Sequence, residues 1–180
     1  KQRTMEAFGA EVIVEDSYGK GITPELIKRM KSRALSLCDN SNAYYADQFG
    51  SPDVTLGYEP MGQEIAISLD HNVDILCASV GTGGAIMGAW QGLTKSDTKV
   101  SVVAFEPLQS PFLTTGKGGA HKVEGIGVGF DPPFLDRAAL SDIRTIDQDL
   151  GFLMCRRLAK EEGIFCSAST GLNVVGAIEL

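Results

Sequence analysis

Short apolar runs alternate with segments of helical periodicity along this chain. Apolar runs bounded by turn residues are typical of buried strands, and apolar residues three or four positions apart are typical of helices. The runs predict strands at Ala10–Val14, Val73–Val80, Lys99–Phe105 and Ile164–Cys166, with a further short one at Ala43–Ala46. The periodicity and the capping residues predict helices at Lys1–Phe8 (closed by Gly9), from Thr23-Pro24 to about Cys38, at Met61–Leu69, at Ala85–Leu93, from Asp147 to about Glu162, and from near Leu172 onward. We expect loops at Gln48–Pro60 and Gln109–Leu140.

The order of elements in the middle of the chain predicts the fold class. The strand Val73–Val80, a glycine turn, the helix Ala85–Leu93 and the strand Lys99–Phe105 form a β-α-β unit. Such a unit joins two parallel strands through a crossover helix. We therefore expect an α/β fold with a mostly parallel sheet.

Composition and charge exclude several classes of protein. Hydrophobic residues make up 43% of the 180 residues and charged residues 22%, which is typical of a globular domain. A net charge of −7 without a dense basic patch argues against binding to nucleic acid or anionic lipid, and no apolar run is long enough to cross a membrane. The cysteines Cys38, Cys77, Cys155 and Cys166 form no C-x-x-C pair, so we expect no metal site and a reducing, cytoplasmic compartment. Cys77 and Cys155 lie in apolar stretches and are expected to be buried thiols.

The strongest candidate for chemistry is the glycine turn Gly81-Thr82-Gly83-Gly84-Ala85. It follows a predicted strand and opens a predicted helix. Successive glycines expose backbone N–H groups, and the helix N-terminus adds partial positive charge, so the turn favours binding of a phosphate. The alternative is a glycine turn that serves only close packing.

A dinucleotide site is a second interpretation of the same turn. Gly81-x-Gly83 would hold the pyrophosphate, and Glu106 at the end of the next strand would bind a ribose diol. The third glycine of the usual fingerprint is missing, because position 86 is Ile86. Other candidates are weaker. Glu124 to Gly129 contains three alternating glycines, and the hydroxyls of Ser167 to Gly171 either cap a helix or face a ligand.

Several motifs follow one another in an order that resembles one enzyme family. They are Gln48-Phe49-Gly50-Ser51-Pro52, Gly62-Gln63-Glu64-Ile65, Val80 to Gly88, Glu106 to Pro111, His121 to Phe130, Glu161 to Phe165 and Ser169-Thr170-Gly171. The series is similar to the cysteine synthase (O-acetylserine sulfhydrylase) and cystathionine β-synthase family. These are pyridoxal-phosphate enzymes of the tryptophan-synthase-β fold, a three-layer, open, mostly parallel twisted sheet flanked by helices. The resemblance extends over essentially the whole chain.

The resemblance implies a role for each matching position. Gly81, Thr82, Gly83, Gly84 and Ala85 would hold the cofactor phosphate with backbone amides and the Thr82 hydroxyl. Family members usually carry threonine where this chain has Ala85, so one hydroxyl contact is lost.

Two further groups of residues receive roles from the resemblance. Ser169 would face the pyridine nitrogen, and a neutral hydroxyl there suits β-elimination chemistry. Gly125, Ile126 and Gly127 would line the substrate side of the cofactor ring.

The resemblance also implies what this chain lacks. The lysine that binds the cofactor lies in a Ser-x-Lys-Asp/Asn-Arg segment in the family, and no lysine here has that context. We therefore expect no catalytic residue in the chain, and a fragment of a β-replacement enzyme that exchanges a substituent of an activated serine for a thiol. Residues 1–50 would be a remnant of the smaller domain and 51–180 a truncated larger, cofactor-binding domain. The complete enzyme would act on a small amino-acid substrate as a homodimer. The alternative is a non-catalytic product that folds or associates only.

Overall fold

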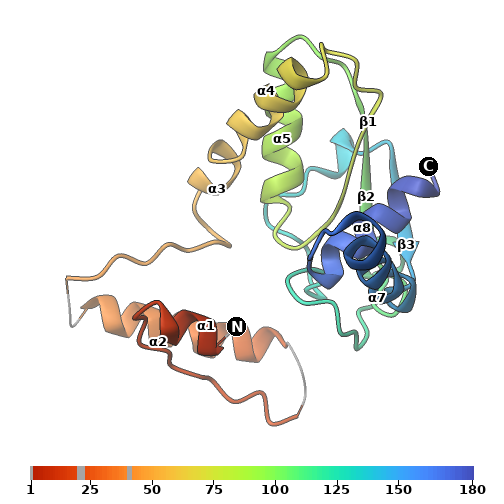
Figure 1. Cartoon of the computed structure of the whole chain (residues 1–180). Coiled ribbons are helices and arrows are strands. Elements are labelled where there is room, and N and C mark those ends of the chain that lie inside the picture. Colours follow the sequence, from red (N-terminus) through yellow and green to blue (C-terminus); the bar gives the residue numbers. More distant parts are fainter. Residues whose placement is uncertain (1, 20–22, 40–41) are drawn as a thin grey trace. The chain divides into compact units, whose positions relative to one another are not determined.

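The structure is a computed structural model that describes residues 2–19, 23–39 and 42–180 (Figure 1). Its elements in chain order are α1 (Gln2–Ala7), α2 (Pro24–Asp39), α3 (Asp53–Leu56), α4 (Glu59–Ser68), β1 (Ile75–Ser79), α5 (Gly84–Lys95), β2 (Ser101–Pro107), α6 (Phe112–Thr115), a 3₁₀ turn (Arg137–Ala139), β3 (Asp142–Ile146), α7 (Gln148–Arg157), a π-helical turn (Leu158–Glu162) and α8 (Ala168–Ile178). The chain divides into two compact units, Lys1–Tyr45 and Ala46–Leu180. The assignment of residues 1–50 and 51–180 to the two domains of the family stays a prediction.

The N-terminal unit contains helices α1 and α2 and an extended segment between them. Gly9, with φ of +88°, follows the end of α1 as expected. The Thr23 hydroxyl accepts a hydrogen bond from the Leu26 amide at 3.2 Å, and so caps α2. The strand predicted at Ala10–Val14 is wrong. The segment is extended but pairs with no other described segment, and the Val14 side chain is exposed.

The C-terminal unit is built on a parallel sheet. Its described residues form three strands in the order β1-β2-β3, with Cys77 opposite Val103 and Phe105 opposite Arg144 (Figure 1). The central strand β2 is buried at every position from Val102 to its end. A strand that is buried on both faces has a continuous apolar run, which is the pattern that predicted this strand.

Helices cover both faces of the sheet. Phe105 belongs to an apolar cluster with Leu172 and Val175 of α8, while the adjacent Ala104 belongs to a second cluster with Met87 of α5. Successive side chains of a strand point to opposite faces, so these two clusters lie on opposite sides of β2. The expected α/β fold, with a mostly parallel sheet between layers of helices, is confirmed.

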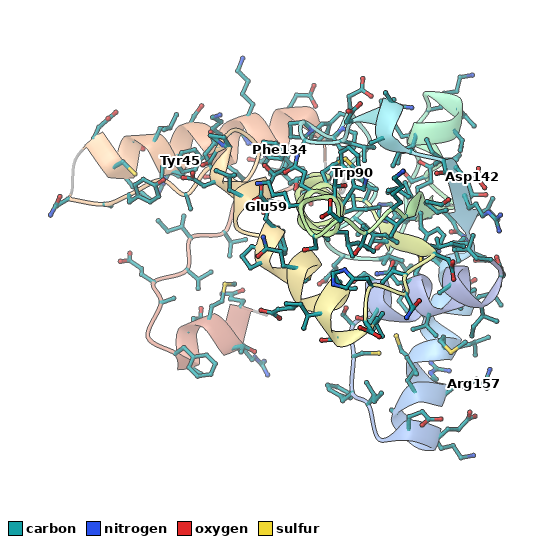
Figure 2. The ribbon with its side chains drawn as sticks, turned by 90° about the horizontal axis from the view of Figure 1, so that it is seen from above. Tyr45, Glu59, Trp90, Phe134, Asp142 and Arg157 are labelled. Carbon is teal, nitrogen blue, oxygen red and sulfur yellow. The ribbon has the colours of Figure 1, made fainter. Side chains whose placement is uncertain are left out.

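Glycines allow α4 and α5 to approach closely. A Cβ atom on Gly62 of α4 would lie 2.0 Å from the carbonyl oxygen of Ala89, and one on Gly92 of α5 would lie 2.0 Å from that of Glu59. No side chain fits in such a space. Figure 2 looks along α5, with Glu59 on the side of α4 and Trp90 on the side of the sheet, where it packs in the second cluster.

The two predicted loops contain structure that the apolar pattern did not indicate. The segment Gln48–Pro60 includes α3 and the first residues of α4, and Gln109–Leu140 includes α6 and the 3₁₀ turn. Residues 142–146, which follow the second loop, form β3. This strand escaped prediction because three of its five residues are polar, and only Ile146 is fully buried.

Two other predicted strands and one helix start are corrected. The segments Ala43–Ala46 and Ile164–Cys166 pair with no described segment, and the Phe165 side chain is 98% exposed. Helix α8 begins at Ala168, one turn before the expected start, because the carbonyl of Ser167 already accepts a hydrogen bond from the amide of Thr170 at 3.0 Å.

Candidate functional site

The glycine turn lies between the carboxyl end of β1 and the first turn of α5, as predicted. Hydrogen bonds hold it from several sides. The amide of Val80 donates to Phe105 O of β2 at 3.0 Å, and the amide of Phe134 donates to Thr82 O at 3.0 Å. Within the turn, the amide of Gly84 donates to Thr82 Oγ1 at 3.2 Å. The turn is therefore anchored both to the sheet and to the long loop that follows β2.

Close packing requires glycine in this turn. A Cβ on Gly81 would lie 2.4 Å from Gly125 O, and one on Gly83 would lie 2.7 Å from Leu135 N. Gly83 also has φ of +86°, which disfavours other residues. Close packing therefore requires these glycines, but it does not account for the amides of the turn.

Most backbone amides of the turn remain available for a ligand. Of the amides from Gly81 to Ile86, only that of Gly84 donates a hydrogen bond within the described residues. The first amides of a helix have no partner in the helix itself and point out of its N-terminus. Ala85, in the first turn of α5, has an exposed side chain. A set of free amides at a helix N-terminus suits an anion such as a phosphate group.

These amides border a cavity of about 530 Å³. Its walls come from the glycine turn, from the segment before α4 and from the loop after β2. The lining residues are Gln48, Asp53, Val54, Gly57, Tyr58, Ser79, Val80, Gly81, Thr82, Gly83, Ala85, Ile86, Gly125 and Ile126. They include no lysine, arginine or histidine, so the amides and the helix N-terminus are the sources of positive potential in the lining. The cavity has the size of a small-ligand site.

The predicted substrate-side residues separate into two groups. Gly125 and Ile126 line the same cavity as the glycine turn. Gly127 is not among the lining residues. Its amide donates to Val80 O at 2.9 Å, and its carbonyl oxygen lies 2.9 Å from His121 Nε2. Gly127 thus fastens the loop to the end of β1, and its predicted contact with a ligand stays untested.

Ser169, in the first turn of α8, is not among the residues that line the cavity. Its hydroxyl lies 2.9 Å from that of Ser167, which also lies 3.2 Å from the hydroxyl of Thr170. Asn173, one turn further along α8, accepts a hydrogen bond from the amide of Ser79 at 2.8 Å, and Ser79 does line the cavity. The start of α8 is thereby fixed relative to the cavity, although Ser169 does not enter it.

Two polar residues that sequence reasoning considered are structural. The Glu106 carboxylate is buried and accepts hydrogen bonds from the amide of Leu113 at 2.6 Å and from the amide and hydroxyl of Thr114 at 3.0 and 2.7 Å. It is not free to bind a ribose, which argues against the dinucleotide interpretation. His121 Nδ1 accepts from the amide of Val123 at 3.3 Å, so Nε2 carries the proton and donates to Gly127 O. His121 therefore stabilises the conformation of the loop through these two hydrogen bonds.

The sequence did not reveal that the segment before α4 forms part of the cavity. Gln48, Asp53 and Tyr58 of this segment, which carry an amide, a carboxylate and a phenol, are among the lining residues. The motif from Gln48 to Pro52 could have indicated this part of the cavity. It contributed to the family resemblance, but no role was assigned to its residues. Among residues 2–19, 23–39 and 42–180, no group of three His, Cys, Asp or Glu side chains forms a metal site, and no helix is long and apolar enough to span a membrane.

Comparisons with known proteins agree with this architecture. A family described as pyridoxal-phosphate dependent enzyme matches residues 1–180. Cysteine synthase 3 of Caenorhabditis elegans is 35% identical over 181 residues, and a cysteine synthase of Staphylococcus aureus is 32% identical over 187 residues. The matches cover 100% and 99% of this chain, but 52% and 56% of those proteins, so the chain spans about half the length of these relatives.

Solved structures give the same result. The cysteine synthase of Entamoeba histolytica superimposes with a TM-score of 0.82 at 32% identity, over 99% of this chain and 52% of that one. The O-acetylserine-dependent cystathionine β-synthase of Helicobacter pylori superimposes with a TM-score of 0.84 at 34% identity, over 99% and 56%. The fold, the glycine turn at the end of β1 and the match over all 180 residues lead to one conclusion: the chain belongs to the family of pyridoxal-phosphate-dependent enzymes.

Proposed function

We propose that the chain provides the phosphate-binding part of a β-replacement enzyme that resembles cysteine synthase. In the complete protein, a leaving group on the β-carbon of an activated serine would be exchanged for a thiol. The relatives named cysteine synthase support the reaction class. The observation that carries the proposal is the set of unpartnered amides between Gly81 and Ile86 at the edge of the cavity.

The residues at the cavity fit the phosphate group of the cofactor. The amides of Gly81, Thr82, Gly83 and Ala85 would donate to its oxygens. The Thr82 hydroxyl accepts from the amide of Gly84, so its own proton is free to be donated to the phosphate. Ala85 contributes its amide but no hydroxyl. Pyridoxal phosphate itself, when bound, supplies the electron sink for chemistry at the amino-acid carbons.

The remaining lining residues would position the rest of the cofactor and the substrate. Gly125 and Ile126, which line the cavity, would lie beside the ring, and Gln48 and Tyr58 would offer hydrogen-bonding groups to a polar ligand. Ser169 is proposed, by resemblance, to meet the pyridine nitrogen with a neutral hydroxyl. That role requires its side chain to turn from Ser167 toward the ligand.

This chain alone is proposed to bind without catalysing. No lysine lines the cavity, so none of the described residues is placed to hold the cofactor covalently. Borohydride reduction in the presence of pyridoxal phosphate, followed by peptide mapping, should label surface lysines partially and at scattered positions. A single lysine that is labelled stoichiometrically would overturn this part of the proposal.

Titration with inorganic phosphate and pyridoxal phosphate, followed by the NMR shifts of the amides from 81 to 86, tests the binding site. We expect phosphate to bind in the millimolar range, equivalent to about −4 kcal/mol. Ala85→Asp should weaken binding about tenfold or more, because a negative charge would stand beside the phosphate. The substitution should not unfold the protein, since an acidic side chain in the first turn of a helix is favourable. Ala85→Thr should strengthen binding through an added hydroxyl.

A matched control separates local charge from overall charge. Ser101→Asp adds the same charge at an exposed position at the amino end of β2, away from the carboxyl ends where the cavity lies. Its phosphate affinity should equal that of the wild type. If the amides from 81 to 86 do not shift in the wild type, or if both Asp variants lose affinity equally, the turn is a packing element and the proposal fails.

A further inference from the structure

Two cysteines that the proposed function does not use lie beside each other where α7 and α8 meet. Cys155, on α7, donates a hydrogen bond from Sγ to the carbonyl oxygen of Ser167 at 3.1 Å. Cys166 directly precedes that acceptor residue in the chain. The Cys155 side chain also lies near enough to Cys166 to contribute to the raised pKa of the Cys166 thiol, after burial. Both cysteines are unpaired and half-buried.

The two thiols differ in how tightly their surroundings are packed. Cys155 lies on a helix that is tightly packed against α8, because a Cβ on Gly171 would come within 2.6 Å of its sulfur and within 2.2 Å of Gly151 O. Cys166 lies in the extended segment after Gly163, where Phe165 is almost fully exposed. That segment pairs with no described strand, so a shift of Cys166 toward Cys155 breaks no sheet hydrogen bond.

We propose that Cys155 and Cys166 form a reversible intramolecular disulfide, with a small-molecule disulfide such as oxidised glutathione as the oxidant. One thiolate attacks a sulfur of the oxidant, and a mixed disulfide and one glutathione thiolate result. The second thiolate then attacks the protein sulfur of the mixed disulfide and releases the second glutathione. Two protein thiols are oxidised, one oxidised glutathione is reduced to two glutathiones, and the two protons go to the leaving thiolates.

The disulfide would change the start of α8. Once Cys155 has lost its proton, Ser167 O keeps only its hydrogen bonds from the amides of Thr170 at 3.0 Å and Gly171 at 3.2 Å. The movement of Cys166 would also pull on the hydroxyl cluster of Ser167, Ser169 and Thr170. An effect on cofactor binding through Ser169 rests on the proposed function, whereas formation of the disulfide does not.

The surroundings of Cys166 make its thiol slow to react. Desolvation raises the pKa of the Cys166 thiol, and the neighbouring Cys155 raises that pKa further. A raised pKa lowers the thiolate fraction at neutral pH. The pair should therefore resist weak oxidants and respond to a sustained excess of oxidised glutathione.

Mass spectrometry of the 180-residue chain after incubation with oxidised glutathione tests the proposal. Trypsin cleaves after Arg144, Arg156 and Lys160, so Cys155 falls in peptide 145–156 and Cys166 in peptide 161–180. Under non-reducing conditions we expect these two peptides to be linked as the main oxidised product, and dithiothreitol to separate them. Separate glutathione adducts on both cysteines, or oxidation of Cys38 and Cys77 alone, would overturn the proposal.

Two variants and one NMR measurement complete the test. Cys166→Ser and Cys155→Ser should abolish the linked product, and Cys38→Ser should leave its yield unchanged. The hydroxyl that Cys155→Ser introduces can still donate to Ser167 O, so this variant should keep the fold. Oxidation should shift the amides of residues 167–171 in the wild type and in neither variant of the pair. If the linked product forms but the NMR shifts of the amides from 81 to 86 do not change on addition of phosphate, the proposed function fails and the proposed disulfide is supported.

Discussion

The Asn173 side chain accepts a hydrogen bond from the backbone amide of Ser79 at 2.8 Å, across 94 positions of the sequence. This bond joins the first half of α8 to the last residue of β1. Ser79 is followed two positions later by the glycine turn. One side chain thus fixes helix α8 to the strand end from which the candidate phosphate site begins.

Asn173→Ala should therefore destabilise the protein by about 1 kcal/mol, the usual net contribution of a hydrogen bond, because this bond is only partly buried. Asn173→Asp keeps an acceptor oxygen at the same place and should lose less. Urea denaturation measures both changes. Equal losses in the two variants would show that the hydrogen bond is not the reason for the effect.

Gly92→Ala tests the close approach of α4 and α5. Alanine normally stabilises the interior of a helix relative to glycine by up to about 1 kcal/mol. Here a Cβ would meet the Glu59 carbonyl oxygen at 2.0 Å, and the two helices would have to separate. We expect a net destabilisation of about 1–3 kcal/mol by chemical denaturation. Thr94→Ala, at an exposed position of the same helix, should change stability by less than about 0.5 kcal/mol. A stabilising Gly92→Ala would mean that the helices have room between them.

Glu106→Gln tests whether the buried carboxylate is structural. An amide offers one acceptor oxygen in place of two and turns an N–H donor toward groups that are themselves donors. We expect a loss of about 2–3 kcal/mol in the free energy of unfolding. Glu64→Gln, an exposed position, is the control and should be nearly neutral. NAD should not raise the Tm of the wild type. A rise in Tm with NAD that disappears in Glu106→Gln would restore the dinucleotide interpretation.

Asp147 makes part of the stability dependent on pH. Its carboxylate caps α7 by accepting from the amide of Asp149 at 3.0 Å, and also accepts from the Gln109 side chain at 2.7 Å. These two bonds hold the pKa of Asp147 below its ordinary value. A lowered pKa in the folded state means that the carboxylate contributes stability above its unfolded pKa of about 4, and that this contribution is lost as the pH falls through the folded value.

Wild type should therefore be more stable than Asp147→Asn at pH 7, and the difference should shrink as the pH falls below about 4. Thermal unfolding from pH 7 down to about 3 measures it. Asp74→Asn removes one exposed carboxylate that has no side-chain hydrogen bond within the described residues, and should show no such trend. A difference between wild type and Asp147→Asn that is constant with pH would contradict the prediction.

Local sequence patterns were sufficient to predict the central β-α-β unit, but they did not predict the elements at the edge of the sheet. The run Val73–Val80, the glycine turn and the run Lys99–Phe105 correctly predicted β1, α5 and β2, because both strands are apolar and the turn is rich in glycine. The edge strand β3 was missed because three of its five residues are polar, so it has no apolar run. The Ile164–Cys166 segment was wrongly assigned as a strand, since its apolar residues say nothing about the presence of a neighbouring strand.

Within the candidate site, too, some features could be predicted from local sequence and others could not. Gly81 to Ala85 could be located from the sequence, because a phosphate-binding turn is continuous in the chain. The approach of Gly125 to Gly81, and the presence of Asp53 in the same cavity, depend on contacts between distant segments that no local pattern encodes. Likewise, the burial of Glu106 against α6 could not be deduced from its place at a strand end.

The burial of β2 from Val102 to Pro107 bears on how the sequence can change over evolutionary time. Each residue from Val102 to Pro107 touches a packed layer on one side or the other, so there is no neutral face on which substitutions can accumulate. In a survey of single-residue variants, this strand should tolerate the fewest replacements, and those tolerated should conserve volume. The exposed segment around Phe165 should accept many. Sequence differences among homologues should therefore be concentrated at the periphery of this unit, and the sequence of β2 should diverge most slowly.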